Sequence, residues 1–296
     1  MTNPALARLG LPPDTKVLII HHDDLGMCHA ANAAFAAIHA LAPAACGAVM
    51  MPAPWAGELI AWAKAHPAAD VGVHLTLNSE WANLRWGPLR PADPDGGLLD
   101  GERRFWRSAR ELRTHRRPQA ALAEMRTQLE LALAQGLDVT HLDAHMGADE
   151  DPALTLGVIE LAVEFRLPVF IPRRAPAGWE ALGFTPAQAV AVTSRMADLE
   201  ASGRALFVDR LLGTGGPLAA RRVQWRGFVT GLAPGINHLY HHAALPGEEV
   251  RAMAPGWEGR VSDTEIFTDP AEWAWLGEQD VHVLGYRTLR DALRTR

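Results

Sequence analysis

One stretch near the start of the chain, Val17–Gly26 (VLIIHHDDLG), constrains the fold and the chemistry more than any other. It begins with an apolar run, which is typical of a buried strand in a parallel sheet. Two histidines, two aspartates and a glycine end the stretch, at the carboxyl end of the strand, where α/β folds place their reactive groups. Because neighbouring strand residues point to opposite faces, we expect Asp23 and Asp24 to point apart and to serve different roles.

The rest of the chain alternates between strand patterns and helical patterns. The spacing predicts helices over 29–41, 55–66, 120–135 and 152–166. It predicts further strands over 46–51, 70–77, 137–145, 168–171, 206–208, 236–242 and 281–284. Alternation without a linker indicates an α/β barrel or wound sheet in a single domain over 1–296. Residues from 78 to about 110 are rich in Trp, Pro, Gly and Asp, and we expect an irregular insertion there.

Composition and charge exclude several classes of protein. The net charge of -6 and the scattered arginines argue against nucleic acid or an anionic membrane as a partner. Cys28 and Cys46 are the only cysteines, so the chain has neither a disulfide framework nor a CxxC metal site. The start of the chain has no apolar run suited to a signal peptide, and prolines interrupt the apolar region 30–65. We therefore expect a cytoplasmic protein.

Histidines gather on or at the ends of the predicted strands. Those in such places are His21, His22, His74, His141, His145, His241 and His242. Strand ends converge at one mouth of a parallel barrel, and one aspartate with two histidines suits a catalytic divalent cation with open positions. Each pattern alone has a plainer explanation, such as a core histidine or an aspartate that caps a helix. Together they favour a metal site. Three histidines without this context are predicted to be surface or packing residues: His66, His115 and His282.

Four segments resemble motifs of the YdjC-like carbohydrate deacetylases, the family that includes chitooligosaccharide deacetylase and hopanoid-biosynthesis deacetylases. VLIIHHDDLG is similar to the family's strand that ends in ADDxG, and VGVHLTLN to its GxHxxL motif. THLDAHMG is similar to its HxDxH motif, and LYHHAALPGEE to its late LxxHPA segment. The order and spacing match over residues 16–292. The resemblance implies a distorted TIM-like (β/α) barrel of about seven strands, as in polysaccharide deacetylases.

The resemblance also implies a metal centre. It makes Asp24, His74 and His145 the ligands of one divalent metal ion. Two histidines and one aspartate suit Zn²⁺, and Mg²⁺ is also compatible with the family. After HxDxH this chain has MGADED, whereas many relatives carry further histidines there. The difference suggests a subgroup that acts on a different substrate.

The acid and base roles follow from the same resemblance. Asp23 becomes the general base, and His242 becomes the general acid that protonates the departing amine. The family's late HP dipeptide is HA in this chain, which leaves the choice between His241 and His242 open. His141 and Asp143 become supporting residues that orient the site.

The implied activity is metal-assisted hydrolysis of an N-acetyl group on an amino sugar or acetylated oligosaccharide. Trp81, Trp86 and Trp106 flank the insertion. We expect Trp81 and Trp86 to bind the sugar, although tryptophans there are equally suited to packing the loop. Two alternatives stay open: a metal hydrolase of another bond such as a phosphoester, and a sugar-binding or regulatory protein without turnover. The sugar, its chain length and the native metal stay open at this point. A homodimer is a possible assembly.

Overall fold

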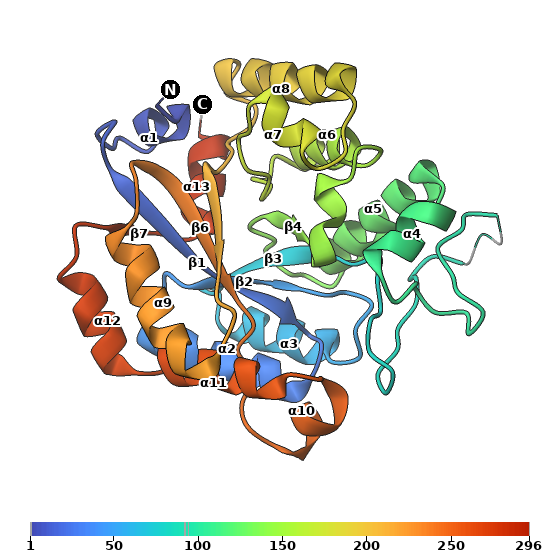
Figure 1. Cartoon of the computed structure of the whole chain (residues 1–296), viewed down its shortest axis with the longest axis horizontal. Coiled ribbons are helices and arrows are strands. Elements are labelled where there is room, and N and C mark those ends of the chain that lie inside the picture. Colours follow the sequence, from blue (N-terminus) through green and yellow to red (C-terminus); the bar gives the residue numbers. More distant parts are fainter. Residues whose placement is uncertain (1, 92, 94, 296) are drawn as a thin grey trace.

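The centre of the structure is a curled parallel sheet (Figure 1). The computed structural model describes residues 2–91, 93 and 95–295. The strands of the sheet are β1 (Lys16–Leu25), β2 (Cys46–Val49), β3 (Asp70–Leu75), β4 (Leu142–Ala144), β5 (Arg210–Gly213), β6 (Gly235–His241) and β7 (His282–Val283). Their order is β4-β3-β2-β1-β6-β5, and β7 pairs with the beginning of β1. The apolar run of β1 is fully buried, as its sequence predicts.

Two isolated bridges connect the outer strands of this sheet. Leu142 in β4 pairs with Val169, and Pro172 pairs with Val208, just before β5. Both pairings are parallel, so the strands surround a common interior. The result is a barrel with regular ladders on one side and single bridges on the other, which confirms the predicted distorted α/β barrel. The two strands predicted at the bridged side are reduced to single pairings, in part because Pro172 has no N–H to donate.

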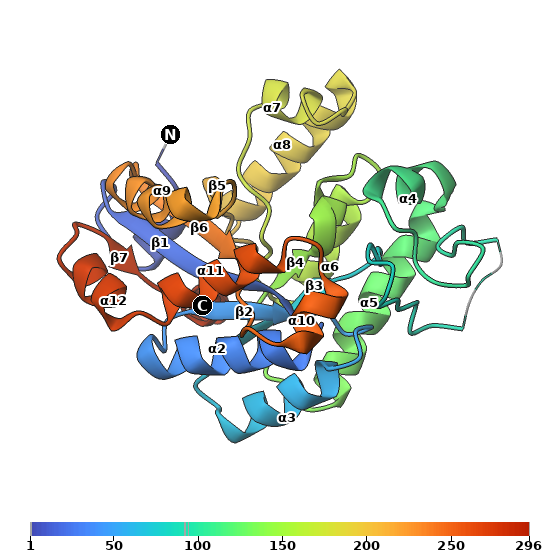
Figure 2. The same ribbon diagram turned by 60° about the horizontal axis from the view of Figure 1, so that its bottom comes forward.

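Helices cover the outside of the sheet (Figure 2). The helices are α1 (Pro4–Arg8), α2 (His29–Leu41), α3 (Ala56–Ala65), α4 (Ala109–His115), α5 (Pro118–Ala134), α6 (Thr155–Phe165), α7 (Pro176–Glu180), α8 (Pro186–Ala201), α9 (Leu218–Thr230), α10 (Glu248–Met253), α11 (Trp257–Phe267), α12 (Pro270–Gly277) and α13 (Tyr286–Arg294). The bounds of α2 are those that the sequence predicts. The pattern does not predict α9, because this helix buries little beyond Trp225 and Val229. No helix in the described part of the chain has the length and apolar character of a membrane span.

The fourth strand is shorter than its sequence pattern predicts. The alternation over 137–145 predicts a strand that includes His145, but β4 ends at Ala144, and the 3₁₀ helix η1 (His145–Glu150) begins at His145. Met146 and Gly147 adopt left-handed conformations with φ of 54° and 67°. The chain therefore turns directly after His145 and leaves this side chain at the rim of the barrel.

Side chains that point into the barrel form layers, because alternate residues of each strand face inward. Val17, Ile19, Cys46 and Ile236 belong to a buried apolar cluster. Above it lies a histidine layer made of His21, His141 and His238. Nε2 of His21 is 2.7 Å from Nε2 of His141, and the ring centroids of His21 and His238 are 4.9 Å apart. Gly72 belongs to this layer, since a Cβ there would approach the His141 ring to 2.6 Å.

The irregular insertion lies between β3 and α4, where the sequence predicts it. It is held together by Arg85, whose guanidinium donates to the carboxylate of Asp100 at 2.6 Å and to the carbonyl oxygen of Phe105 at 2.7 Å. Ser108 ends the insertion and forms a capping box with Glu111 at the start of α4. The insertion is therefore a folded loop beside the rim of the barrel.

Candidate metal centre

Asp24, His74 and His145 come together at one rim of the barrel. Asp24 lies near the end of β1, His74 lies in β3, and His145 begins η1 directly after β4. Oδ1 of Asp24 is 3.4 Å from Nε2 of His74 and 3.1 Å from Nδ1 of His145. One atom of each side chain lies within 4.8 Å of the others. The structure thus brings together the three ligands that the resemblance implies.

The donor set fits a small divalent cation. Oδ1 of Asp24 is buried and has no hydrogen-bond partner among the residues that the structure describes. Ligand atoms about 2.1 Å from a tetrahedral Zn²⁺ lie about 3.4 Å apart, which is close to the two distances between Oδ1 and the imidazole nitrogens. An ion between these atoms would give the buried oxygen the partner that it needs.

Asp24 faces the cavity because its backbone adopts the left-handed conformation, with φ of 63°. The register between β1 and β2 shifts at this place, between His22 and Leu25. In a regular strand Asp23 and Asp24 would face opposite sides, but here both line the same cavity. The expectation that the two carboxylates point apart is therefore wrong. A non-glycine residue with positive φ is strained, and such residues cluster at functional sites.

Each of the three side chains has a second charged group close to it. Arg260 of α11 donates to the other oxygen of the aspartate, Oδ2, at 2.8 Å. Nδ1 of His74 lies 2.9 Å from Oδ1 of Asp143. Nε2 of His145 is hydrogen-bonded to Oε2 of Glu80 at 3.0 Å. A carboxylate at the far nitrogen of an imidazole is typical of metal-ligating histidines, because it fixes the tautomer and orients the ring.

Charges around the centre shift the pKa values of all three side chains. Burial opposes ionisation of Asp24, but the Arg260 guanidinium holds the pKa of this carboxyl well below its ordinary value. Burial also opposes a charge on His74, but Asp143 raises the pKa of the imidazole well above its ordinary value. For His145, burial is outweighed by two neighbouring carboxylates, and the pKa rises to about 9. A cation that binds here must therefore displace protons from both imidazoles.

Asp23 and His242 lie beside the centre. Nε2 of His242 is 3.8 Å from Oδ2 of Asp23. His21 is hydrogen-bonded to Oδ1 of Asp23 at 2.6 Å, and it keeps the pKa of this carboxyl below its ordinary value despite burial. The alternation of β6 turns His242 towards the cavity and His241 outwards, where the His241 ring stacks on Phe267 at 4.1 Å. The geometry therefore favours His242 over His241 as a group that acts on a ligand.

His141 and Asp143, the predicted supporting residues, occupy two different layers. Asp143 is the partner of His74 across the β3–β4 pairing, and it contacts this imidazole directly. His141 lies one layer lower, bonded to His21 and to Oγ1 of Thr140 at 2.9 Å. Burial lowers the pKa of His141 well below its ordinary value. His141 is thus connected to the rim through the imidazole of His21.

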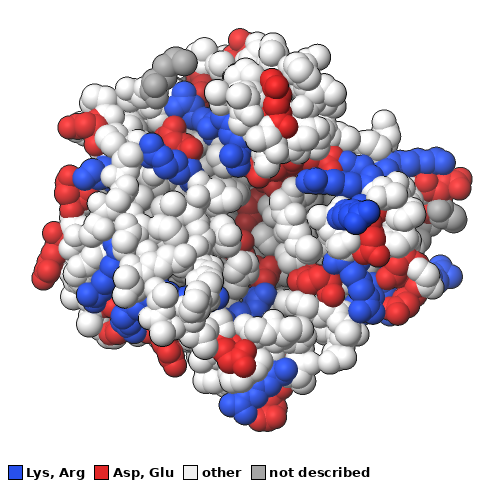
Figure 3. Space-filling view, in the orientation of Figure 1, with Lys and Arg blue, Asp and Glu red and all other residues white. Residues whose placement is uncertain are grey.

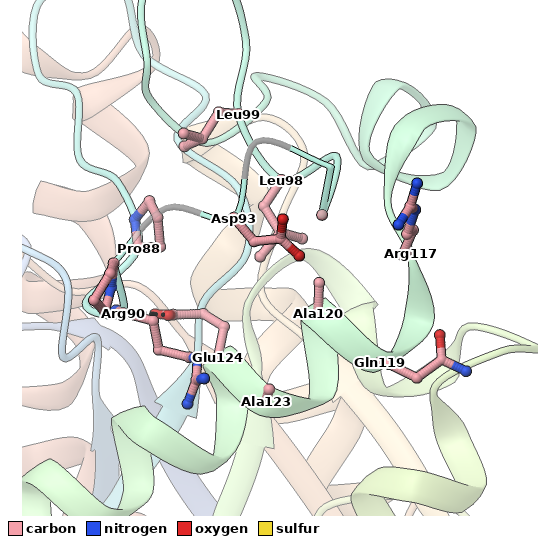
Figure 4. Close-up of a pocket in the computed structure, with 12 residues that line it drawn as sticks. Pro88, Arg90, Asp93, Leu98, Leu99, Arg117, Gln119, Ala120, Ala123 and Glu124 are labelled. Carbon is pink, nitrogen blue, oxygen red and sulfur yellow. Dashed lines mark hydrogen bonds between the residues drawn. The ribbon is translucent and has the colours of Figure 1, made fainter.

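The centre opens into a cavity of about 400 Å³. Its lining residues are Asp23, Asp24, His74, Glu80, Asp143, Ala144, His145, Met146, Gly147, Asp149, Glu150, Phe170, Leu211, His238, Tyr240, His242 and Arg260. In the view of Figure 3, acidic side chains lie in a hollow near the middle of the molecule. A second cavity, of about 390 Å³, lies between the insertion and α5 (Figure 4). Its described lining has no histidine, whereas four histidines line the first cavity.

Most of the chain matches one protein family. The model of the YdjC-like protein family covers residues 17–278. The chain belongs to this family. It is 34% identical over 295 residues to a carbohydrate deacetylase of Thermus thermophilus, across 97% of this chain and 98% of the relative. It is 32% identical over 155 residues to a carbohydrate deacetylase of Brevibacillus brevis, across 52% of this chain and 59% of the relative.

A solved structure has the same fold as this YdjC-like chain. It is the crystal structure of an Enterococcus faecalis protein whose name refers to cellobiose-phosphate cleavage. The TM-score is 0.75 at 18% sequence identity, across 93% of this chain and 99% of that protein. At this identity the likeness concerns the fold alone, and it supports the distorted barrel described above.

The two tryptophans predicted to bind a sugar are buried in this YdjC-like protein. Trp81 and Trp86 are 8% and 4% exposed, and the described lining of the cavity does not include them. The Trp86 ring centroid is 6.5 Å from that of His145. The guanidinium of Arg260 lies 5.1 Å from the centroid of the Trp81 ring. Both rings thus pack beside side chains of the candidate metal centre.

Three residues of the site escape the sequence patterns: Glu80, Arg260 and Asp149. Glu80 lies six positions after His74 at the start of the insertion. Its place just beyond a strand end is the sequence signal that could identify it as a site residue. Arg260 reaches its aspartate partner over 236 positions, and no local pattern reports such a contact. Asp149 belongs to the MGADED segment. The chain turns there because Met146 and Gly147 are left-handed, and the strand alternation does not predict this turn.

Proposed function

We propose that this YdjC-like protein removes the N-acetyl group from an amino sugar or an acetylated oligosaccharide. One observation carries the proposal. The unpartnered Oδ1 of Asp24 faces the imidazoles of His74 and His145, while Asp23 and His242 line the same cavity. The names of the Thermus thermophilus and Brevibacillus brevis relatives support a carbohydrate as the substrate.

Asp24, His74 and His145 would hold one divalent cation. When bound, Zn²⁺ or Mg²⁺ polarises a carbonyl oxygen and lowers the pKa of water in its coordination sphere, for Zn²⁺ towards about 7. Glu80 and Asp143 orient the two imidazoles through their far nitrogens. Two nitrogen ligands and one oxygen ligand favour Zn²⁺ over Mg²⁺, which prefers oxygen ligands.

Asp23 and His242 would move the two protons of the reaction. Asp23 accepts a proton from water as the water oxygen bonds to the acetyl carbon. His21 holds the Asp23 carboxylate in place through the 2.6 Å hydrogen bond. His242 gives a proton to the sugar nitrogen as the C–N bond breaks, so that acetate and an amine are the products. General acid and base groups of this kind contribute roughly 10²–10⁴-fold to a rate.

An acetate-release screen tests the proposal. The protein is stripped of metal with a chelator, divided, and reloaded with Zn²⁺ or Mg²⁺. Each sample is incubated with N-acetylated monosaccharides and oligosaccharides, and acetate is measured. We expect release that is lost on chelation and returns with the metal. Cleavage of p-nitrophenyl phosphate without acetate release from any sugar would favour a phosphoester hydrolase. Sugar binding without any turnover would favour a binding protein.

Location in the cytoplasm and a homodimer stay predictions.

A further inference from the structure

Three consecutive carboxyl groups, those of Asp149, Glu150 and Asp151, stand where η1 ends. Two of them are paired with arginine. Glu150 accepts hydrogen bonds from Arg174 at 2.6 Å and 3.2 Å, and Asp151 lies 3.1 Å from the guanidinium of Arg113. Asp149 differs from both. Its Oδ2 is buried and receives no hydrogen bond from any residue that the structure describes.

Asp149 lines the cavity of the metal centre. It is 2% exposed, the same value as Asp24 and His74, and all three residues line this cavity.

The backbone around Asp149 is fixed in place. Thr155 donates to the carbonyl oxygen of Asp149 at 2.7 Å, and Arg174 holds the next residue, Glu150. On the other side, the left-handed conformations of Met146 and Gly147 turn the chain along the cavity. A side chain on such a fixed turn is already in position for a ligand, so little conformational freedom is lost on binding.

A buried carboxyl group without a partner destabilises the folded chain, so its presence beside the metal centre calls for a ligand. A carboxyl oxygen accepts a hydrogen bond from a hydroxyl group. A sugar hydroxyl is therefore a suitable partner for the unpaired Oδ2 of Asp149.

We propose that Asp149 is a substrate-binding residue whose carboxyl group hydrogen-bonds a hydroxyl group of the acetylated sugar. This assignment rests on the proposed deacetylase function. Asp149 makes no bond to the reacting atoms. It fixes the sugar ring so that the acetyl group lies over the metal centre, and it selects sugars that carry a hydroxyl group at the matching position.

The test compares Asp149→Ala with Asp149→Asn, which keeps both a donor and an acceptor. Asp198→Ala, an exposed change on α8, is the control. The kcat and KM for acetate release from N-acetylglucosamine and its linked dimer are measured for each variant, with metal content and thermal unfolding. We expect Asp149→Ala to raise KM about 10- to 100-fold with kcat within about threefold. Asp149→Asn should recover most of this loss, and metal content should not change.

Thermal unfolding separates binding from a structural role. Removing an unpartnered carboxyl group should leave the Tm of Asp149→Ala equal to that of the parent or higher. Deoxy analogues of the sugar should show which hydroxyl is bound. For the analogue that lacks the bound hydroxyl, Asp149→Ala should not raise the KM any further. A lower Tm with loss of metal, an unchanged KM, or an equal loss in Asp149→Asn would overturn the proposal.

Failure of the proposed function is distinguishable from failure of this assignment. If the parent protein releases no acetate, the deacetylase proposal fails, and binding of the same two sugars is measured by titration calorimetry instead. Binding weakened by Asp149→Ala and restored by Asp149→Asn would then support the assignment. Equal binding in all variants, or no binding by the parent, would overturn it.

Discussion

The histidines at the rim and those deeper in the barrel have opposite surroundings. His74 and His145 each have carboxylate oxygens near both ring nitrogens, and these charges raise their pKa values. His141 and His238 instead contact Tyr286, the first by stacking at 4.1 Å and the second through a 2.9 Å hydrogen bond. Burial lowers the pKa values of both. His74 and His145 are thus suited to a cation, whereas His141 and His238 are suited to neutral packing, and His21 connects the two layers through its hydrogen bond to Asp23.

The largest expected effect concerns the rim. Asp23→Asn removes the carboxylate proposed to accept a proton, while Asp24, His74 and His145 stay in place. Acetate release should fall about 10²–10⁴-fold, and the metal content should equal that of the parent. Steady-state kinetics and metal analysis of one preparation give both values. Unchanged turnover would remove Asp23 from the mechanism.

The next effect concerns the histidine layer. Gly72→Ala places a Cβ 2.6 Å from the ring and the carbonyl oxygen of His141. Overpacking of this kind should lower the free energy of unfolding by about 1–3 kcal/mol, measured in urea. Gly57→Ala in α3 is the matched control, since its Cβ meets no described atom within 4 Å. Equal stability of both variants would show that the layer is loosely packed.

His145 at the rim and His22, which lies outside both groups with its ring beside Phe35, should also respond oppositely to pH in metal-free protein. Burial lowers the pKa of His22 to about 3, below about 6.5 in the unfolded chain. The unfolded state therefore binds the proton more readily, and stability falls as the pH drops below about 6.5. The pKa of His145 is raised to about 9, so its stabilising contribution is present below about 6.5 and is lost as the pH rises through about 9.

Urea midpoints measured from pH 4 to pH 9 in the presence of a chelator check both signs. His22→Asn should flatten the acid side of the parent curve, because it removes the group that protonates on unfolding. His145→Asn should flatten the alkaline side. Curves of the two variants that run parallel to the parent curve would contradict the described surroundings of both histidines.

The smallest effect belongs to histidines in neither group. His66 and His115 are exposed and stack on Trp62 and Trp106 at 4.4 Å and 4.2 Å. Replacing His66 or His115 with Gln should change the free energy of unfolding by no more than about 0.5 kcal/mol. Metal content and acetate release should equal those of the parent. A loss of metal in either variant would show that the ion does not bind at the rim.

The sequence predicts those parts of the barrel that depend on local pattern. The apolar run of β1 and the alanine-rich α2 are found where the pattern places them. The strand alternation of β6 also contains the choice between His241 and His242, because residues two apart share a face. Once the structure shows that His238 faces inward, this rule places His242 on the same side.

Other parts of the site depend on contacts that no local pattern reports. Asp24 turns into the cavity through a bulge, and that bulge is set by the pairing of β1 with β2. Glu80 and His145 are 65 positions apart in the chain, and Arg260 and Asp24 are 236 apart. Such contacts arise only when the barrel has formed. The sequence therefore predicts the residues that could bind a metal. It does not predict the groups that orient those residues.

The number of metal ions bound per chain tests the central claim most directly. The parent, His74→Ala and His238→Asn are stripped, reloaded with Zn²⁺, freed of excess ion and analysed for metal. The account predicts close to one ion per chain for the parent and for His238→Asn, and almost none for His74→Ala. Full occupancy in a folded His74→Ala variant would contradict the account, because the rim would then not be the place where the ion binds.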